Sequence, residues 1–284
     1  MRFGANTFIW RSPFSTKTDL DLIQKVEQFG FDLIEIAVED PALIDLDELE
    51  AALVQNGLGV VTGGVYGPGR NISSLDEKER MAARDYLMWM IDAAQRLGSD
   101  VVNGPMYSAV GKARLEDPAD REKEWNFAVE GLKGVCGYAA ERGVKLAFEP
   151  LNRFETDLIN VVDQGLKLIE DVGAPNLGFH LDTFHMHLEE KDSAAAIRKA
   201  GDRLFHFHAC ENDRGVPGAG QVNWQSIFQA LVEIGYNGNI VIESFTPEVK
   251  SIARAVCIWR EIAPDQDTIA REGLRFIKSF PDLA

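Results

Sequence analysis

Residues 145–182 read KLAFEPLNRFETDLINVVDQGLKLIEDVGAPNLGFHLD, and this stretch decides the fold of the chain. Two short runs rich in apolar residues, Lys145–Glu149 and Leu177–Asp182, are typical of buried strands. Between them, Val161–Asp171 has the spacing of an amphipathic helix, and a glycine follows it closely. A helical connection returns the chain to the same end of a sheet, so the segment predicts a parallel strand–helix–strand unit.

The same unit repeats from one end of the chain to the other, with no proline- or serine-rich linker. The predicted strands are Arg2–Phe8, Leu33–Val38, Gly59–Gly63, Val101–Gly104, Lys145–Glu149, Leu177–Asp182, Leu204–His208 and Ile240–Glu243. The predicted helices are Thr18–Phe29, Leu46–Asn56, Leu75–Leu97, Trp125–Arg142, Val161–Asp171, Ser193–Ala200, Trp224–Ile234 and Asp267–Ser279. Most helices end near Gly or Asn, which is typical of a helix C-terminus that leads into the next strand.

Eight alternating units predict a parallel sheet covered by helices, and eight is the number at which such a sheet closes. We therefore interpret residues 1–284 as one α/β domain, a single (β/α)8 TIM barrel. An open, doubly wound sheet is the alternative. That fold usually carries a glycine-rich nucleotide turn after its first strand, whereas this chain has Asn6-Thr7-Phe8-Ile9-Trp10 there.

Composition excludes several classes of protein. The chain is 45% hydrophobic and 26% charged, and its formal net charge is −16. No segment has the apolar run of a membrane helix and the first residues lack a signal-peptide pattern, so a cytoplasmic location is expected. The negative charge argues against nucleic acid and favours a neutral substrate. Cys136, Cys210 and Cys257 form no CxxC pair and are expected to be reduced.

Four consecutive predicted strands end in potential metal ligands. In a barrel of this kind the active site lies where the strands end. The last residues of the fifth to eighth strands are Glu149, Asp182, His208 and Glu243. Any one of these carboxylates alone has an ordinary explanation as a helix cap or an ion-pair partner.

Taken together, these four residues favour a metal site. Three carboxylates gathered at one mouth would repel one another and take up protons, whereas a divalent cation lets all of them ionise. Three oxygen donors and one imidazole, with no thiolate, suit Mn²⁺ or Mg²⁺, with Co²⁺ as a further alternative, better than they suit a structural zinc.

All five histidines lie within residues 180–208. We interpret His180 and His206 as interior residues of their strands and His187 as peripheral. His185, in the loop after the sixth strand, is placed to contact a substrate.

Several loop residues are candidates for substrate binding. Glu155 and Arg214 follow the fifth and seventh strands, where a simple loop ion pair is the alternative. Gly67 belongs to Gly63–Gly69, which lacks the Lys-Ser/Thr of a phosphate loop and indicates a flexible loop beside the site. Aromatic residues in other loops are expected to form pocket walls, with core packing as the alternative: Trp10, Phe14, Tyr66, Tyr107 and Phe245.

Five segments carry a family resemblance: Glu149–Glu155 (EPLNRFE), Leu181–Met186 (LDTFHM), His206–His208 (HFH), Arg214–Gly218 (RGVPG) and Val241–Phe245 (VIESF). With them the chain resembles, over nearly its whole length, the ketose 3-epimerases of the tagatose, allulose (psicose) and L-ribulose type within the xylose isomerase-like barrels. The resemblance implies an isomerase that epimerises an unphosphorylated ketose at C3 through an enediolate. It also implies a homodimer or homotetramer.

The resemblance assigns roles to the candidate residues. It implies that Mn²⁺ or a similar ion is held by Glu149, Asp182, His208 and Glu243. It implies that Glu149 and Glu243 also act as an acid/base pair on opposite faces of the sugar. Contacts with the O1, O2 and O3 region are implied for Glu155, His185 and Arg214.

Other activities use the same kind of site. An aldose–ketose isomerase, an inosose isomerase or a keto-glycoside enzyme are alternatives within the superfamily. A sugar-binding barrel without turnover is disfavoured by the paired glutamates, and a multi-metal hydrolase by the single imidazole at the rim. The chain departs from the family pattern in two loops. It has Asn6 after the first strand, where relatives have an aromatic ring, and its Gly104–Ser108 loop has no Trp. In the family these loops contact the far end of the sugar, so the identity of the ketose stays open.

Overall fold

Eight parallel strands form a closed barrel in the computed structural model, which describes residues 1–114 and 117–283. Each strand pairs with the next, and β1 pairs with β8 from Arg2↔Asn239 to Ala5↔Ile242. The strands are β1 (Arg2–Asn6), β2 (Leu33–Val38), β3 (Gly59–Gly64), β4 (Val101–Gly104), β5 (Lys145–Phe148), β6 (Leu177–Asp182), β7 (Leu204–Ala209) and β8 (Asn239–Ile242). This closure confirms the (β/α)8 barrel and excludes the open sheet.

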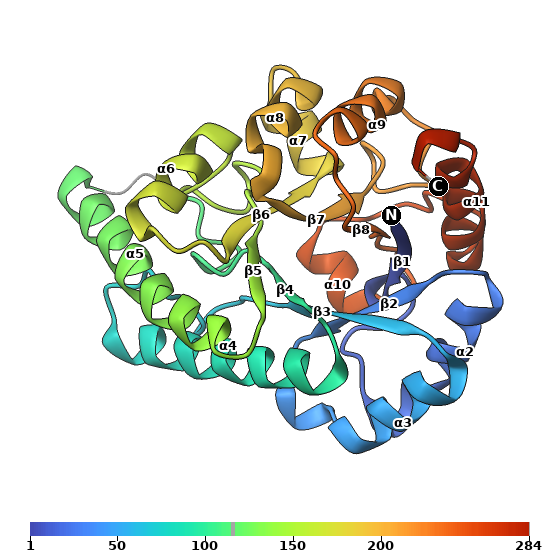
Figure 1. Ribbon diagram of the computed structural model, residues 1–284, viewed down its shortest axis with the longest axis horizontal. Helices are drawn as coiled ribbons and strands as arrows, with labels where there is room; N and C mark the ends of the chain where they lie inside the picture. The colour runs from blue at the N-terminus through green and yellow to red at the C-terminus, as the bar shows by residue number, and fades with distance from the viewer. Residues whose placement is uncertain (115–116, 284) are drawn as a thin grey trace.

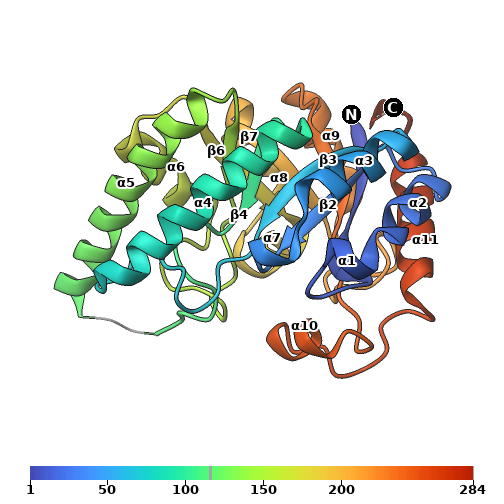
Figure 2. The ribbon, with the colours of Figure 1, turned by 90° about the horizontal axis from the view of Figure 1, so that it is seen from below.

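The helices surround the barrel, and both chain ends lie near β1 (Figure 1). They are α1 (Thr16–Asp19), α2 (Asp21–Gln28), α3 (Leu46–Asn56), α4 (Glu77–Leu97), α5 (Pro118–Ala140), α6 (Val162–Val172), α7 (Thr183–Glu189), α8 (Ser193–Ala200), α9 (Trp224–Glu233), α10 (Lys250–Ala255) and α11 (Gln266–Lys278). Figure 2 shows α10 apart from this ring, beyond the ends of the strands. None of the helices in the described ranges combines the length and apolar character needed to cross a membrane.

Most boundaries follow the predicted ones closely, and the exceptions have local causes. The first strand stops at Asn6, because that side chain accepts a hydrogen bond from the backbone N–H of Phe8 and begins a 3-10 turn. Helix α5 starts seven residues before the predicted Trp125, where Asp117 caps it and Pro118 occupies its first position. The short helices α7 and α10 were not predicted.

The interior of the barrel changes from apolar to polar along the strands. Side chains of alternate residues face the interior. Near the amino ends of the strands an apolar layer consists of Leu33, Val61, Val101, Ala147 and Val241. Two residues further along β2, β4, β5 and β8 come Glu35, Asn103, Glu149 and Glu243. On these four strands the polar side chains therefore lie nearer the loops than the apolar layer does.

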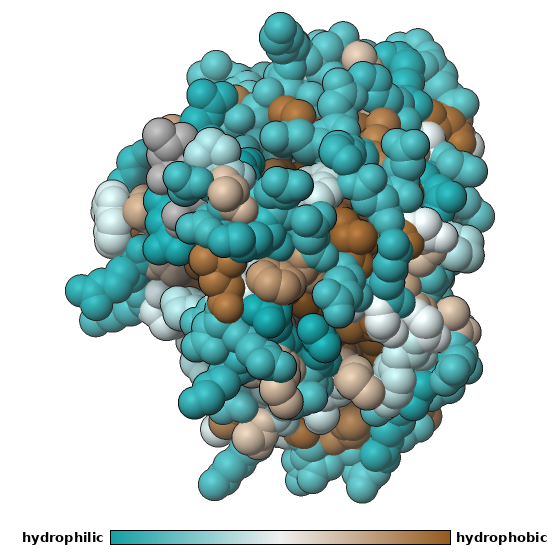
Figure 3. All heavy atoms as spheres, turned by 90° about the vertical axis from the view of Figure 1, so that its left-hand side faces the viewer, coloured by the Kyte–Doolittle hydropathy of each residue, from teal (hydrophilic) through white to brown (hydrophobic). Residues whose placement is uncertain are grey.

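The outer surface is mainly hydrophilic. The face formed by α4, α5 and α6 shows scattered hydrophobic spots among polar side chains and no broad apolar area (Figure 3). Large apolar side chains that remain exposed include Met81 and Met88 of α4 and Phe154. Scattered apolar residues of this kind are normal on a protein surface.

Candidate active site

The structure brings the four predicted metal ligands together. Glu149 and Glu243 directly follow β5 and β8, Asp182 ends β6, and His208 lies in β7. One ligand atom each of Glu149, Asp182 and His208 lies within 4.8 Å of the others. Glu243 adjoins the same group, since its Oε2 is 3.6 Å from Nδ1 of His208. All four side chains are buried.

The imidazole of His208 has the arrangement expected of a metal ligand. Its Nε2 lies 3.0 Å from Oε1 of Glu35. Its Nδ1 is buried, lies on the side of Glu243 and has no hydrogen-bond partner in the described part of the chain. Metal-binding histidines usually donate one ring N–H to a carboxylate while the other nitrogen binds the ion. Three carboxylates and this nitrogen therefore fit a divalent cation such as Mn²⁺, Mg²⁺ or Co²⁺.

The electrostatics of the carboxylates point to the same conclusion. Burial, followed by the negative charges of Glu243 and Asp182, raises the pKa of Glu149 well above its usual value. Burial also raises the pKa of Asp182, although Arg214 acts in the opposite direction. Burial alone would raise the pKa of Glu243, but His208 and then Arg214 bring it below the usual value. A metal ion at this position would supply the positive charge that favours the ionised form of Glu149 and Asp182.

Arg214 lies inside the cluster of carboxylates. Its Nη1 donates to Oδ2 of Asp182 at 2.7 Å and to Oε2 of Glu243 at 2.9 Å. The guanidinium carbon is 3.9 Å from the centre of the Phe184 ring and 4.9 Å from that of Phe245. This cation–π stacking holds the planar group in a fixed orientation beside the ligands.

His185 and Glu155 lie next to this cluster and are joined by Asn152. Nε2 of His185 is 3.6 Å from Oε1 of Glu149 and 3.3 Å from Nη2 of Arg214. Nδ1 of His185 accepts the backbone N–H of Asn152 at 3.0 Å, and the Asn152 amide donates to Oε1 of Glu155 at 2.7 Å. Sequence reasoning did not single out Asn152, although it lies in the EPLNRFE segment.

A cavity of about 290 Å³ opens above these residues. Its lining includes five charged side chains and one imidazole: Glu39, Glu149, Glu155, Arg214, Glu243 and His185. Gly67 and Phe245 also line it, together with Phe8, Tyr66 and residues of α10. Asp182 and His208 are not among the lining residues. The cavity therefore exposes the two glutamates of the cluster to a small molecule.

Three of the predicted wall residues lie elsewhere. The Tyr107 hydroxyl donates to the backbone oxygen of Ile159 at 2.8 Å, and its ring packs edge-on against Phe148. Trp10 donates from its indole nitrogen to Asp267 at 2.7 Å. Phe14 is buried in the main hydrophobic core. Each of these rings is surrounded by neighbouring elements. The sequence alone does not show which elements lie next to which ring.

The position of Asn6 suggests a residue beside the sugar, and that of Phe8 suggests a residue inside the first strand. The structure shows the reverse arrangement. Phe8 lines the cavity and packs against Phe245, with ring centres 5.5 Å apart. Asn6 points into the barrel instead and donates to Oε1 of Glu35 at 2.7 Å. The 3-10 turn that begins after Asn6 places Phe8 over the mouth.

Glu35 is a buried carboxylate that sequence reasoning missed. It lies on β2, is 1% exposed, and contacts both His206 and His208. Burial acts to raise its pKa, but the two imidazoles outweigh burial and bring the pKa well below the usual value. The available signal was a single acidic residue inside the apolar run LIEIAV.

The other histidines lie at different depths. His206 is buried and places Nε2 2.7 Å from Oε2 of Glu35. His180 is also buried, with Nδ1 3.6 Å from Oε2 of Glu149. His187 is exposed on α7. Cys136, Cys210 and Cys257 are all free, as expected, and Cys210 lies next to Arg214.

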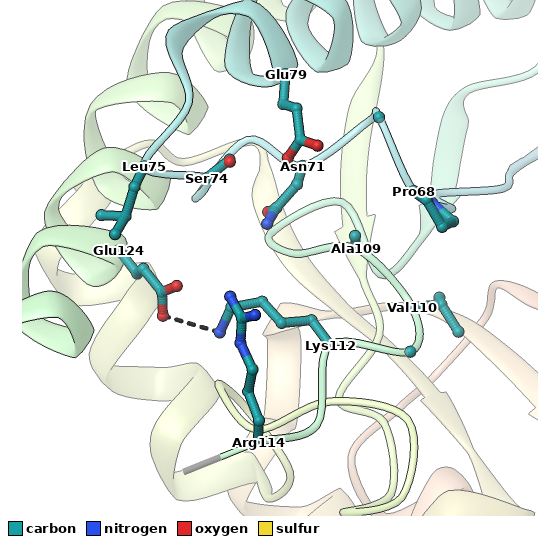
Figure 4. A pocket seen from close by; sticks show the side chains of 12 residues that line it. Pro68, Asn71, Ser74, Leu75, Glu79, Ala109, Val110, Lys112, Arg114 and Glu124 are labelled. Atoms are coloured by element: carbon teal, nitrogen blue, oxygen red, sulfur yellow. Dashed lines mark hydrogen bonds and ion pairs between the residues drawn. The ribbon is translucent and has the colours of Figure 1, made fainter. Parts of the chain in front are cut away.

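A second hollow adjoins the cavity. Figure 4 shows the side chains that line this hollow. Pro68 and Val110 border both spaces. Nζ of Lys112 in this hollow is 2.8 Å from Glu124 and 2.8 Å from Asp157. Because two carboxylates neutralise this buried lysine, it offers little attraction to an anion.

Comparison with known proteins places the chain in a family. The family model of the xylose isomerase-like TIM barrels matches residues 23–280. The chain belongs to this family. The L-ribulose 3-epimerase of Methylomonas sp. (strain DH-1) is 32% identical over 280 residues, covering 98% of this chain and 97% of that protein. The D-psicose 3-epimerase of Agrobacterium fabrum (strain C58 / ATCC 33970) is 32% identical over 272 residues, covering 94% and 93%.

Solved structures agree with the sequence relatives. A crystal structure of the D-allulose 3-epimerase from Methylomonas sp. in complex with D-allulose matches with a TM-score of 0.92 and 32% identity, covering 98% of this chain and 96% of that one. The resemblance to the ketose 3-epimerases is thereby confirmed. The chain is an isomerase of the carbohydrate epimerase class.

Proposed function

We propose that the protein epimerises a free, unphosphorylated ketose at C3, with a divalent metal held by Glu149, Asp182, His208 and Glu243. The observation that carries the proposal is the placement of two glutamates on one small cavity. Glu149 follows β5 and Glu243 follows β8, so two strands separate them in the barrel. They approach a bound molecule from different sides, as inversion of a carbon centre requires.

Expected metals are Mn²⁺ first and Mg²⁺ or Co²⁺ as alternatives, because the donors are three carboxylates and one imidazole. When bound, such an ion supplies positive charge that stabilises the negative charge which develops on the substrate oxygens during proton removal.

The protein's own groups move the proton. One glutamate removes the proton from C3 of the ketose, giving an enediolate, and the other donates a proton to the opposite face. His185, Arg214 and Glu155 line the same cavity and bind the oxygens of the O1–O3 region. Phe8, Phe245 and the residues of α10 cover the cavity and exclude water from the reacting carbon.

The names of the relatives support this choice of substrate class. They include L-ribulose and D-psicose 3-epimerases, and solved structures include complexes with D-allulose and D-tagatose. The polar groups in the cavity are mainly acidic, with one arginine engaged by Asp182 and Glu243. A neutral sugar fits this lining better than a sugar phosphate.

A substrate panel tests the proposal. Purified, Mn²⁺-loaded protein is incubated in D₂O with D-allulose, D-fructose, D-tagatose, L-ribulose and an aldose set, and the products are identified by NMR. We expect interconversion of ketose pairs that differ only at C3, with deuterium entering C3. Products that are aldoses, or deuterium at a different carbon, would support the aldose–ketose or keto-glycoside alternatives. A bound ketose that gains no deuterium would indicate a sugar-binding barrel.

We further propose that residues 1–284 act as one catalytic domain, that the protein is a homodimer or homotetramer, and that it is cytoplasmic. Sedimentation equilibrium of the purified protein checks the second point. A monomer at micromolar concentration would contradict it.

A further inference from the structure

Glu35 is surrounded by hydrogen-bond donors inside the barrel. Its Oε1 accepts from the Asn6 amide at 2.7 Å, and its Oε2 accepts from the Asn103 amide at 2.9 Å. Nε2 of His206 lies 2.7 Å from Oε2, and Nε2 of His208 lies 3.0 Å from Oε1. The four partners come from β1, β4 and β7, so the carboxylate connects strands that lie on different sides of the barrel.

The barrel makes room for this group. A side chain at Gly63, on β3, would place its Cβ 2.9 Å from Oε1 of Glu35 and 3.2 Å from Oδ1 of Asn103. Two residues earlier on β2, on the same side of the strand, Leu33 fills the interior with an apolar side chain. A buried carboxylate contributes little to stability compared with an apolar side chain of similar size. Its presence at this level therefore calls for a role other than packing.

The chemistry of the partners fixes the protons. Two asparagine amides and two imidazole nitrogens converge on the two oxygens of Glu35, and an ionised carboxylate satisfies this arrangement by accepting from all four. An ionised carboxylate has no proton to give, and His208 must therefore carry its proton on Nε2. Nδ1 of His208, which lies 3.6 Å from Oε2 of Glu243, is then the nitrogen left for the cluster of carboxylates.

We propose that Glu35 is a positioning residue that holds His208 with its proton on Nε2 and its Nδ1 directed at the metal ligands. The inference rests on the proposed function in one respect, since it assumes a divalent ion at Glu149, Asp182, His208 and Glu243. Glu35 itself lies behind His208 and does not line the cavity. It acts through the imidazole, on the affinity of the site for its metal.

The test compares Glu35→Gln with Asn103→Ala. Glu35→Gln removes the charge and keeps the volume of the side chain. Asn103→Ala disturbs the same network but leaves the contact between Glu35 and His208 in place. Binding of Mn²⁺ to the metal-stripped full chain is measured by isothermal titration calorimetry. We expect Glu35→Gln to weaken binding by about 10- to 100-fold, the usual effect of losing a group that orients a metal ligand. Asn103→Ala should bind Mn²⁺ almost as the unmodified protein does.

A second readout reports the proton directly. The chain has five histidines, so ¹⁵N spectra of the Mg²⁺-loaded protein resolve their ring nitrogens. We expect His208 to show a protonated Nε2 and an unprotonated Nδ1 in the unmodified protein and in Asn103→Ala, and a mixture of states in Glu35→Gln. A purely structural role would change neither the tautomer nor the ratio of the two affinities. If Glu35→Gln fails to fold, Glu35→Asp retains the charge but withdraws it from His208, and the same loss of affinity is expected.

The outcomes separate the two proposals. Unmodified protein that binds no Mn²⁺ would overturn the proposed metal site and this inference with it. Unmodified protein that binds Mn²⁺, with Glu35→Gln binding equally well and keeping the His208 tautomer, would overturn only the role of Glu35.

Discussion

The two halves of the barrel contribute differently to one cavity. Glu149, Asp182, His208 and Glu243 lie at or next to the carboxyl ends of strands β5 to β8, and these are the groups able to bind a metal and move protons. The loops after β1, β3 and β4 supply apolar and glycine residues to the same space, including Phe8, Gly67 and Pro105. The charged half, β5 to β8, therefore holds the candidate metal ligands, whereas the apolar half, β1 to β4, contributes mainly apolar and glycine residues to the cavity together with one carboxylate, Glu39.

The difference also shows how one half supports the other. Glu35 of the first half lies in the interior, accepts hydrogen bonds from Asn6 and Asn103, and contacts His208 of the second half. They contribute no atom to the cavity lining. The candidate metal ligands thus lie on four strands, while the hydrogen bonds around His208 extend across the barrel to Glu35.

Changing a glutamate of the charged half should have the largest effect. Glu149→Gln and Glu243→Gln each replace a carboxylate that we propose holds the metal and transfers a proton, so we expect turnover to fall by at least about 10²- to 10⁴-fold. The measurement is steady-state epimerisation of the best ketose from the panel. Val54→Ala, at an exposed position of α3 that does not line the cavity, is the control. Substantial turnover in both Gln variants would contradict the acid/base scheme.

Removal of the metal should lower both activity and stability. A ligand that binds only the folded state at about 100 times its Kd stabilises it by about 2.7 kcal/mol. We therefore expect a lower thermal unfolding temperature after treatment with a chelator, restored by Mn²⁺. Calcium and zinc in parallel samples test ion preference. An unfolding temperature that does not respond to any divalent ion would contradict a metal site at this mouth.

Arg214→Lys should have an intermediate effect. Lysine keeps the charge but loses the planar group that contacts Asp182 and Glu243 and stacks on Phe184. Losing a hydrogen bond between charged groups costs about 1.5–3 kcal/mol, which corresponds to an increase in KM of about 10- to 150-fold. Initial rates over a range of ketose concentrations give KM and kcat separately. An unchanged KM would show that Arg214 stabilises the loop and does not bind the substrate.

Tyr66→Phe, in the apolar half, should have the smallest effect. The Tyr66 hydroxyl is buried, and no partner for it is found in the described residues. We expect the free energy of unfolding to stay the same or rise by up to about 1 kcal/mol, because an unsatisfied polar atom is removed. Urea denaturation measures it, and KM for the ketose is measured alongside. A clear loss of stability would show that the hydroxyl has a partner in solution.

Much of the site could be predicted from strand ends. Two-residue alternation and the parallel arrangement place Glu149, Asp182, His208 and Glu243 on the interior side at one end of the barrel. The sequence therefore determines the barrel, the order of its strands and the identity of the charged cluster. These features depend on local pattern and on a rule that parallel barrels share.

Only the tertiary structure decided which side chains meet across the barrel. Tyr107 and Phe8 are both aromatic residues that follow strands, yet Tyr107 packs beneath a loop and Phe8 lines the cavity. Glu35 contacts His208 from 173 residues away along the chain. No local pattern encodes such a contact, because it depends on the closure of the sheet and on the depth of each residue within it.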